Sequence, residues 1–211
     1  MSQADLFAFG QALGEGACLL RGFADVEASA LLACIEQLLA QAPLRHMETP
    51  GGFRMSVAIS NCGSAGWTTD AQGYRYSSHD PLSGQPWPPM PALLSALATK
   101  AAAAAGYAGF QADACLINRY QPGARMSLHQ DRNERDFSQP IVSVSLGLPA
   151  TFLFGGLQRR DRPRRLLLCS GDVVVWGGPT RLAFHGVAPL AVGQHPLCGT
   201  CRYNLTFRKA L

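Results

Sequence analysis

Long apolar runs are absent from this sequence of 211 residues. No stretch approaches the about 18 consecutive apolar residues of a membrane-spanning helix, so we expect no membrane partner. The first residues, Met1 to Leu6, have neither the basic stretch nor the apolar core of a secretory signal. Seven cysteines form an odd set without the framework of a small disulfide-rich domain, which indicates reduced thiols. These features together predict a cytoplasmic protein.

Lysine is scarce, and charge of either sign is sparse. The eighteen basic residues comprise two lysines, Lys100 and Lys209, and sixteen arginines, and the net charge is +4. Charged residues make up 15% of the chain and hydrophobic residues 47%, which is typical of a folded globular protein and excludes a disordered one. The length predicts a single domain over residues 1–211 with a sizeable core. A modest net charge does not by itself identify a partner.

Two helices are expected in the first half of the chain. Asp25 is a plausible N-cap for a helix over Val26–Gln41, which carries an apolar stripe. A second helix is predicted from Pro91, suited to a first turn, to Gly106, suited to a left-handed cap. Between them, residues 45–90 show weak periodicity, and a segment of this length is usually functional or disordered.

The remainder of the sequence is a succession of short strands separated by turn residues, a pattern typical of a sandwich or barrel. With the two helices, it predicts a mainly β protein with flanking helices, of the α+β class. The predicted strands are Ala17–Arg21, Ala114–Tyr120, Ala124–Leu128, Ile141–Leu148, Thr151–Phe154, Arg165–Cys169, Asp172–Trp176, Arg181–His185 and Arg202–Arg208.

Two histidines and one carboxylate lie at the ends of predicted strands or just after them. His129 and Asp131 are two residues apart, a spacing that projects side chains from the same face of a strand. His185 closes another predicted strand, after a Gly-Gly-Pro turn. Two histidines and a carboxylate are the facial ligand set of non-haem Fe(II) oxygenases, which leaves positions open for a co-substrate and O2. From these residues alone, a zinc hydrolase is a competing interpretation.

The last predicted strand alternates polar and apolar residues, so one face carries two arginines. Polar side chains also share a face near the end of the predicted strand Ala114–Tyr120. If these faces line a barrel interior, the guanidinium groups need an anionic partner, because burying an unpaired charge is costly. A small dicarboxylate beside the metal would serve, whereas an ordinary surface strand is the alternative. The polar residues are Arg202, Asn204, Thr206 and Arg208 on one strand and Asn118 and Tyr120 on the other.

The metal and anion residues, in their order along the chain, resemble those of the AlkB family of Fe(II)/2-oxoglutarate-dependent dioxygenases, which repair alkylated nucleic acids. The resemblance runs from about Leu44 to Arg208. It includes Thr49-Pro50-Gly51-Gly52, Ser60-Asn61-Cys62-Gly63, Gly66-Trp67-Thr68-Thr69, Asn118-Arg119-Tyr120, Ser143-Val144-Ser145-Leu146-Gly147 and Phe154-Gly155-Gly156. It implies a double-stranded β-helix (jelly roll) over residues 114–211. Residues 1–44 would be an N-terminal strand and helical support, 45–90 a nucleotide-recognition lid, and 91–113 a supporting helix.

The resemblance also implies cofactors and the residues that hold them. Fe(II) would be bound by His129, Asp131 and His185, with 2-oxoglutarate and O2 as co-substrates. Arg202 would bind the distal carboxylate of 2-oxoglutarate and Arg208 the carboxylate next to the iron. Asn118, Tyr120 and Asn204 would assist Arg202.

A base alkylated on its pairing edge, such as 1-methyladenine or 3-methylcytosine, must leave the duplex to react. The resemblance implies alkylated DNA, single- or double-stranded, as the partner, with RNA as a second candidate. The methyl group would be hydroxylated as 2-oxoglutarate is decarboxylated, which releases formaldehyde, succinate and CO2. No obligate protein partner is expected, and a monomer suffices. The substrate-binding residues implied are Trp67, Tyr74, Tyr76, Asn133 and Arg159.

Two features bear on the range of substrates. Arg132 and Asn133 stand where the close bacterial pattern has Lys and Asp, and the loss of that acidic group leaves the adduct range open. Five arginines in the segment Arg159–Arg165, here called the arginine hairpin, predict phosphate contacts, with a solvated charge run as the alternative. A dioxygenase of proteins or small molecules is a rival enzyme. A metal-holding jelly roll without turnover is a rival of another class.

Overall fold

The computed structural model describes residues 10–211. A seven-stranded antiparallel sheet forms its larger layer, in the order β1-β2-β11-β8-β13-β6-β3. A four-stranded sheet, β10-β9-β12-β7, faces it, and β4 and β5 form a separate hairpin. The strands are β1 (Gly10–Gly14), β2 (Ala17–Leu20), β3 (Ala58–Gly63), β4 (Gly66–Asp70), β5 (Gly73–Ser77), β6 (Ala114–Tyr120), β7 (Met126–His129), β8 (Ile141–Gly147), β9 (Ala150–Phe154), β10 (Arg164–Leu168), β11 (Val173–Trp176), β12 (His185–Val187) and β13 (Arg202–Arg208).

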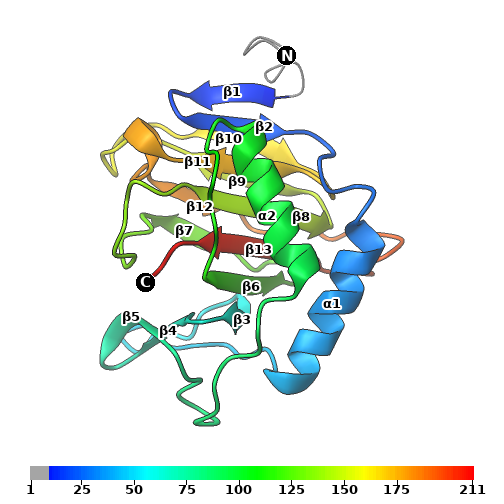
Figure 1. Ribbon diagram of the computed structural model, residues 1–211, viewed down its shortest axis with the longest axis vertical. Coiled ribbons are helices and arrows are strands. Elements are labelled where there is room, and N and C mark those ends of the chain that lie inside the picture. The colour runs from blue at the N-terminus through cyan, green and yellow to red at the C-terminus, as the bar shows by residue number, and fades with distance from the viewer. Residues whose placement is uncertain (1–9) are drawn as a thin grey trace.

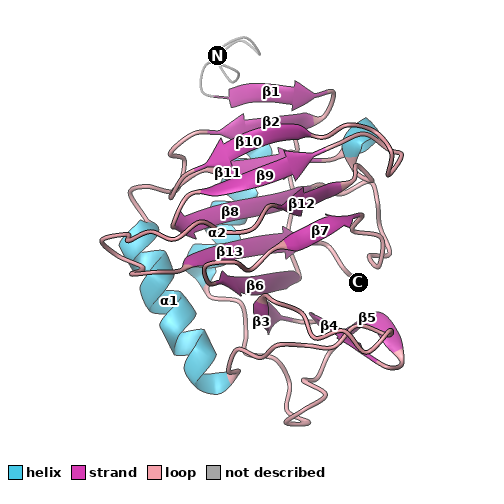
Figure 2. Cartoon of the chain, turned by 180° about the vertical axis from the view of Figure 1, so that it is seen from behind, coloured by secondary structure: helices cyan, strands magenta, loops and turns pink. Residues whose placement is uncertain are grey.

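The two helices, α1 (Ala28–Gln41) and α2 (Ala92–Ala104), cover one face of the larger sheet (Figure 1). The smaller sheet covers the other face, as the reverse view shows (Figure 2). Two apolar clusters result, one between helices and sheet and one between the two sheets. This two-sheet architecture with helices on one outer side confirms the predicted mainly β fold of the jelly-roll type.

Strand alternation divides the larger sheet between these two layers. On β13, Leu205 and Phe207 pack into the helix-side cluster, while the residues between them point toward the smaller sheet. On β8, Val142 and Val144 also belong to the helix side. The apolar face of β13 packs on the side of α1 and α2, so its polar face points into the interior between the two sheets, as predicted.

The boundaries of several elements differ from the predictions. Helix α1 begins at Ala28, and Asp25 is not its cap; the N-cap residue is Glu27, without a side-chain hydrogen bond. The chain turns at this point, since the Asp25 N–H donates to the Gly22 carbonyl over 3.1 Å. The second helix ends as expected, with Gly106 at a φ of 91°, in the left-handed region.

Residues 45–90 are more regular than their weak periodicity indicated. Strand β3 pairs with β6 over its whole length and so belongs to the larger sheet. Strands β4 and β5 form a hairpin separate from both larger sheets, beside β3 in both views (Figures 1 and 2). No helix within residues 10–211 is long and apolar enough to cross a membrane.

Candidate active site

Two strands of the smaller sheet bring the predicted metal ligands together. His129, the last residue of β7, lies directly opposite His185, the first residue of β12. One ligand atom from each of these histidines and from Asp131 lies within 4.8 Å of the others. Within the described part of the chain, this is the one such group of three or more His, Cys, Asp or Glu side chains.

The local backbone around this group differs from the prediction in two places. Strand β7 ends at His129, so Asp131 lies in the following loop and strand alternation does not explain the meeting of the two side chains. The predicted strand over Arg181–His185 is wrong, because a 3₁₀ turn over Gly178–Thr180 is continued by a helical conformation at Arg181. The strand begins at His185 itself.

Hydrogen bonds fix the orientation of both imidazoles. Nδ1 of His129 lies 2.8 Å from the Ser127 carbonyl oxygen, and Nδ1 of His185 lies 3.0 Å from that of Ala183. A proton donated from Nδ1 leaves the Nε2 lone pair of each ring available as a ligand. Both Nε2 atoms lie 3.7 Å from an oxygen of Asp131. Burial lowers the pKa of His185 to about 4, which keeps this imidazole neutral at neutral pH.

Asp131 is held by a buried ionic cluster. Arg208 donates to Oδ2 of Asp131 from Nη2 over 2.6 Å and from Nε over 2.9 Å. Glu134 also lies near this guanidinium, 3.4 Å from Nε, and pairs with Arg181 over 3.1 Å. Although burial opposes ionisation, the adjacent Arg208 and both histidines hold the pKa of the Asp131 carboxyl well below its usual range. The carboxylate is thus charged and oriented, as a metal ligand must be.

Arg202 lies deeper in the same interior and is 1% exposed. Its Nη2 donates to Ser145 Oγ over 2.9 Å, and its guanidinium carbon lies 5.0 Å from the centre of the Tyr120 ring. Its Nε and Nη1, together with Asn118 Oδ1, have no hydrogen-bond partner within residues 10–211. A buried guanidinium with two unpaired donors fits a carboxylate ligand, because it is too costly to leave unpaired.

A network of side-chain amides and hydroxyls supports this anion site. Asn204 donates to Ser143 Oγ over 2.8 Å and accepts from Thr206 Oγ1 over 3.0 Å. Asn118 Nδ2 lies 3.3 Å from Asn204 Oδ1. All these side chains lie on the interior faces of β6, β8 and β13, and they line a cavity of about 980 Å³ with the metal ligands at its centre.

Some residues of this interior were missed by the sequence analysis. Glu134 and Arg181 stand in irregular segments, where no periodicity indicates which side chains are buried. Ser143 and Ser145 did carry a signal, since they alternate with valines in an apolar strand and so share one face. That alternation could have identified Ser145 as a partner of Arg202.

The predicted substrate residues lie around the cavity mouth. The rings of Trp67 and Tyr74 stack with centroids 5.7 Å apart and planes 21° apart. Trp67 Nε1 donates to Asn133 Oδ1 over 3.2 Å. Tyr76 points away from the two stacked rings. Its hydroxyl donates to Glu134 over 2.7 Å, and burial raises the pKa of Tyr76 well above its usual value. Trp67, Tyr74 and Asn133 line the cavity, whereas Tyr76 reaches toward the ionic cluster.

The arginine hairpin reaches the same cavity through Arg159. Arg159 donates to the Leu128 carbonyl over 2.8 Å and stacks over the Phe184 ring at 5.0 Å, which fixes it beside the metal strand β7. All five arginines of the hairpin are exposed, and the last two belong to β10 rather than to a loop. Besides the buried Arg202 and Arg208, three exposed arginines line the same cavity, namely Arg54, Arg125 and Arg132.

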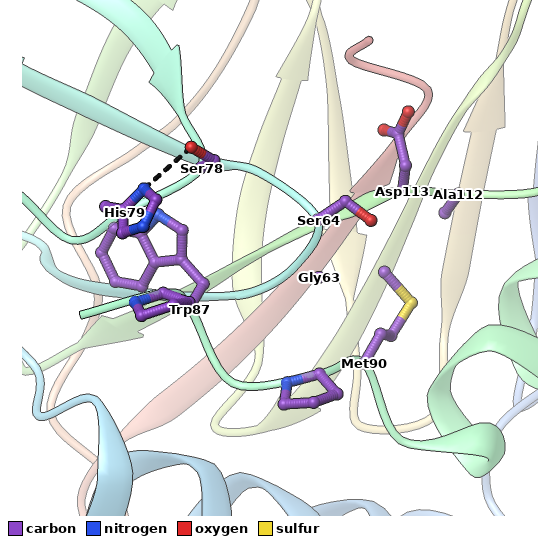
Figure 3. Close-up of a pocket in the computed structure, with 10 residues that line it drawn as sticks. Gly63, Ser64, Ser78, His79, Trp87, Met90, Ala112 and Asp113 are labelled. Carbon is purple, nitrogen blue, oxygen red and sulfur yellow. Dashed lines mark hydrogen bonds between the residues drawn. The ribbon is translucent and has the colours of Figure 1, made fainter.

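A second cavity, of about 440 Å³, lies apart from this centre, between the β3–β4 turn, the loop before α2 and the residues Ala112 and Asp113 before β6 (Figure 3). Trp87 forms one wall, and Ser78 bonds to His79 Nδ1 over 2.9 Å. The Asp113 carboxylate at its edge is already paired with Lys209 over 2.8 Å. The side chains of His79 and Asp113 therefore already have partners within the described residues.

Comparisons with known proteins agree with this geometry. A family model described as the 2OG-Fe(II) oxygenase superfamily matches residues 16–208. The chain is 58% identical over 210 residues to the alpha-ketoglutarate-dependent dioxygenase AlkB of Escherichia coli K12, covering 98% of this chain and 97% of that protein. The chain belongs to the AlkB family. It is therefore an Fe(II)/2-oxoglutarate-dependent dioxygenase that uses O2.

More distant members of the AlkB family match as well. A Caulobacter vibrioides AlkB homolog is 47% identical over 193 residues, covering 90% of this chain and 85% of that protein. The solved structure of OsALKBH1 superimposes with a TM-score of 0.81 at 27% identity, covering 95% of this chain and 99% of that one. The unpaired donors of Arg202 and the His-Asp-His group fit the co-substrate and the metal of this family.

Proposed function

We propose that this AlkB-family enzyme removes N-linked methyl groups from nucleobases, of the 1-methyladenine and 3-methylcytosine type, in DNA and in RNA. The stacked pair of Trp67 and Tyr74 at the mouth of the metal cavity carries the proposal, because a partly buried Trp67 and an exposed Tyr74 that both line the cavity provide aromatic surface for an extruded base to stack on. Two more distant relatives bear matching names: the human protein is called a nucleic acid dioxygenase, and an Arabidopsis thaliana protein a DNA N(6)-methyladenine demethylase.

In this proposal His129, Asp131 and His185 hold Fe(II), and Arg202 holds the distal carboxylate of 2-oxoglutarate with Asn118, Tyr120 and Asn204 around it. When bound, Fe(II), 2-oxoglutarate and O2 supply the oxidation, which yields succinate, CO2 and a hydroxylated methyl group that leaves as formaldehyde. Arg208 keeps Asp131 ionised and in place through two hydrogen bonds. Its predicted contact with the second carboxylate of 2-oxoglutarate stays part of the proposal.

The rim supplies contacts for the nucleic acid. Trp67 would stack on the extruded base, held in position by its hydrogen bond to Asn133. Asn133 offers an uncharged amide beside the base, where a carboxylate would favour a cationic one. Tyr76, held in place by its hydrogen bond to Glu134, would form the inner part of the base pocket.

The arginines on both sides of the mouth favour a nucleic acid over a small molecule. Arg54, Arg125 and Arg132 line one part of the cavity, and Arg159 approaches it from the hairpin. Exposed arginines spread along a rim suit a polyphosphate backbone, whereas a small substrate would contact few of them. All seven cysteines lie within the described residues and are unpaired, which supports a reducing compartment, so we include the cytoplasm in the proposal.

The test is a demethylation assay on a synthetic oligonucleotide. With Fe(II), 2-oxoglutarate and O2, an oligonucleotide carrying 1-methyladenine should lose its methyl group, and formaldehyde and succinate should appear in equal amounts. Mass spectrometry of the oligonucleotide measures the loss of the methyl group directly. Succinate formation with every methyl group retained would contradict the proposed substrate while leaving the dioxygenase chemistry intact.

A further inference from the structure

Two cysteines just before β13 take no part in the proposed function. Cys198 and Cys201 are the ends of a tight turn, in which Cys201 N donates to the Cys198 carbonyl over 3.4 Å. Cys201 Sγ lies 3.1 Å from that same carbonyl oxygen. The end residues of a β-turn have Cα atoms less than about 7 Å apart, and disulfides usually bridge Cα atoms about 4.4–6.8 Å apart. The turn thus holds the Cα atoms of the two cysteines within the range that a disulfide can span.

The turn is fixed to the larger sheet rather than hanging free. The Cys201 carbonyl accepts from Leu148 N over 3.1 Å, and two backbone bonds of 2.8 and 2.9 Å close the preceding loop between His195 and Gly199. Cys198 packs so closely on Gly147 that a Cβ on that glycine would lie 2.8 Å from the cysteine Cβ. Because this backbone is already ordered, little conformational freedom remains to be lost on closing a bond across it.

Solvent access separates this pair from the other cysteines. Cys198 and Cys201 are both partly exposed. Cys62 and Cys115 also lie opposite each other, on β3 and β6, but both are fully buried in the helix-side core. Cys169 is exposed but has no second cysteine near it in the sequence. Among the described cysteines that are at least partly exposed, Cys198 and Cys201 are the two that one tight turn joins.

We propose that Cys198 and Cys201 form a thiol–disulfide exchange site that closes an intramolecular disulfide with a low-molecular-weight disulfide such as oxidised glutathione. One thiolate attacks a sulfur of that disulfide, which releases one glutathione thiolate and leaves a mixed disulfide on the protein. The second cysteine then displaces the remaining glutathione. The two cysteines lose two protons and two electrons in total, and one oxidised glutathione becomes two reduced molecules. In a reducing compartment such a bond is transient.

The surroundings of the two sulfurs set the order of attack. Burial raises the pKa of Cys198 to about 11, and the neighbouring Cys201 raises it further. Burial also raises the pKa of Cys201, but the Arg119 guanidinium opposes this shift. Tyr203 is the other titratable group facing Cys201. Arg119 lies opposite Tyr203, two residues after Cys201, in the pairing of β6 with β13, so its positive charge favours the Cys201 thiolate. We therefore assign Cys201 as the attacking sulfur and Cys198 as the resolving one, and exchange should become faster as the pH rises from 7 to 9.

The test uses the full chain with a chelator, treated with oxidised glutathione, alkylated and digested with trypsin. Both cysteines lie in one tryptic peptide, residues 182–202. In the wild-type protein this peptide should lose two hydrogen atoms, take up no alkyl group and retain no glutathione. The Cys198→Ser variant should instead keep one glutathione on Cys201, since the resolving thiol is gone. The Cys169→Ser variant is the matched control and should close the bond at the wild-type rate.

Two results would overturn the proposal. One is a wild-type peptide in which both cysteines stay alkylatable while Cys169 reacts with glutathione. The other is a stable glutathione adduct on each cysteine, which shows that the sulfurs cannot reach each other. Circular dichroism of each serine variant separates these outcomes from misfolding. Neither result depends on whether the enzyme demethylates nucleic acids.

Discussion

The floor and the rim of the main cavity are built in opposite ways. The floor consists of buried side chains on β6, β8 and β13, tied together by hydrogen bonds that fix Arg202 and Asn204, and of the ionic cluster that Asp131 and Glu134, in the loop after β7, form with Arg208. The rim consists of the β4–β5 hairpin, which exposes its turn and Tyr74, and the arginine hairpin, whose five arginines are exposed. Rigid strands thus hold the groups that must be placed accurately, and surface segments carry the contacts that choose a substrate. Substitutions on the floor should remove chemistry or stability, and those on the rim should change substrate binding alone.

The largest effect is expected for Asp131→Ala on the floor. Loss of a metal ligand should abolish Mn(II) binding, measured by calorimetry, together with turnover. The fold should persist, because Arg208 keeps its contact with Glu134. Asp136→Ala, in the same loop but outside the cavity, is the control and should bind metal normally. Unchanged metal binding by Asp131→Ala would remove it from the ligand set.

Glu134→Gln should mainly destabilise the protein. Breaking a buried ion pair by removing one charge costs about 3–5 kcal/mol, which for a chain of this size lowers the Tm by roughly 10 °C. Thermal unfolding followed by circular dichroism measures the change. Glu48→Gln, exposed in the lid, is the rim counterpart and should leave the Tm as it was. Equal Tm values for both variants would contradict the division between floor and rim.

Arg202→Met should weaken 2-oxoglutarate binding without affecting the metal. A charge-assisted hydrogen bond contributes about 1.5–3 kcal/mol, so the Kd should rise about 10- to 150-fold. Arg202→Lys should recover part of this loss, because it restores the charge but not the two-donor fork. Calorimetric titration of the Mn(II)-loaded protein gives both values. A wild-type Kd in Arg202→Met would place the co-substrate elsewhere.

Trp67→Ala should act on the nucleic acid only. Stacking of one base on an aromatic ring is worth about 1–3 kcal/mol, so the Kd for a methylated oligonucleotide should rise about 5- to 150-fold. The Kd for 2-oxoglutarate should not change, and Trp67→Phe, which keeps a ring, should retain most of the affinity. If 2-oxoglutarate binding fell in parallel, Trp67 would belong to the floor.

The smallest effect is expected for a single hairpin arginine. Arg160 is exposed, and its guanidinium bonds only to Gln158 among the described side chains. In a plot of the logarithm of oligonucleotide affinity against the logarithm of salt concentration, Arg160→Gln should make the slope less steep by about 0.7 for a single strand. This change corresponds to the loss of one phosphate contact. Lys100→Gln, on α2 behind the larger sheet, is the control for net charge. If wild type and Arg160→Gln gave identical slopes, Arg160 would make no phosphate contact, and the hairpin arginines would be solvated surface charges.

The floor was largely predictable from the sequence because strand alternation links sequence position to direction. The interior face of Arg202–Arg208 and the interior positions of Asn118 and Tyr120 follow from a period of two. Strand alternation does not show that His129 meets His185, because their pairing joins residues 56 positions apart through the β7–β12 register.

Irregular segments account for what was missed. Arg181 was placed on a strand, but a 3₁₀ turn carries it into the interior, where it donates to the backbone of Asp131 over 2.9 Å. Glu134 reads as an ordinary charged loop residue, and only tertiary packing makes it the partner of two arginines. Asp25 has the side chain of a helix cap, yet the turn before α1 uses other bonds. Local pattern carries no information about such long-range choices.

The most direct test of the account is a crystal structure of the chain with Mn(II) and 2-oxoglutarate bound. We predict one anomalous scattering peak bonded to both histidine Nε2 atoms and to the Asp131 carboxylate, with a carboxylate of 2-oxoglutarate on Nε and Nη1 of Arg202. A metal bound away from these three side chains, or a co-substrate that leaves those two nitrogens unpaired, would contradict it.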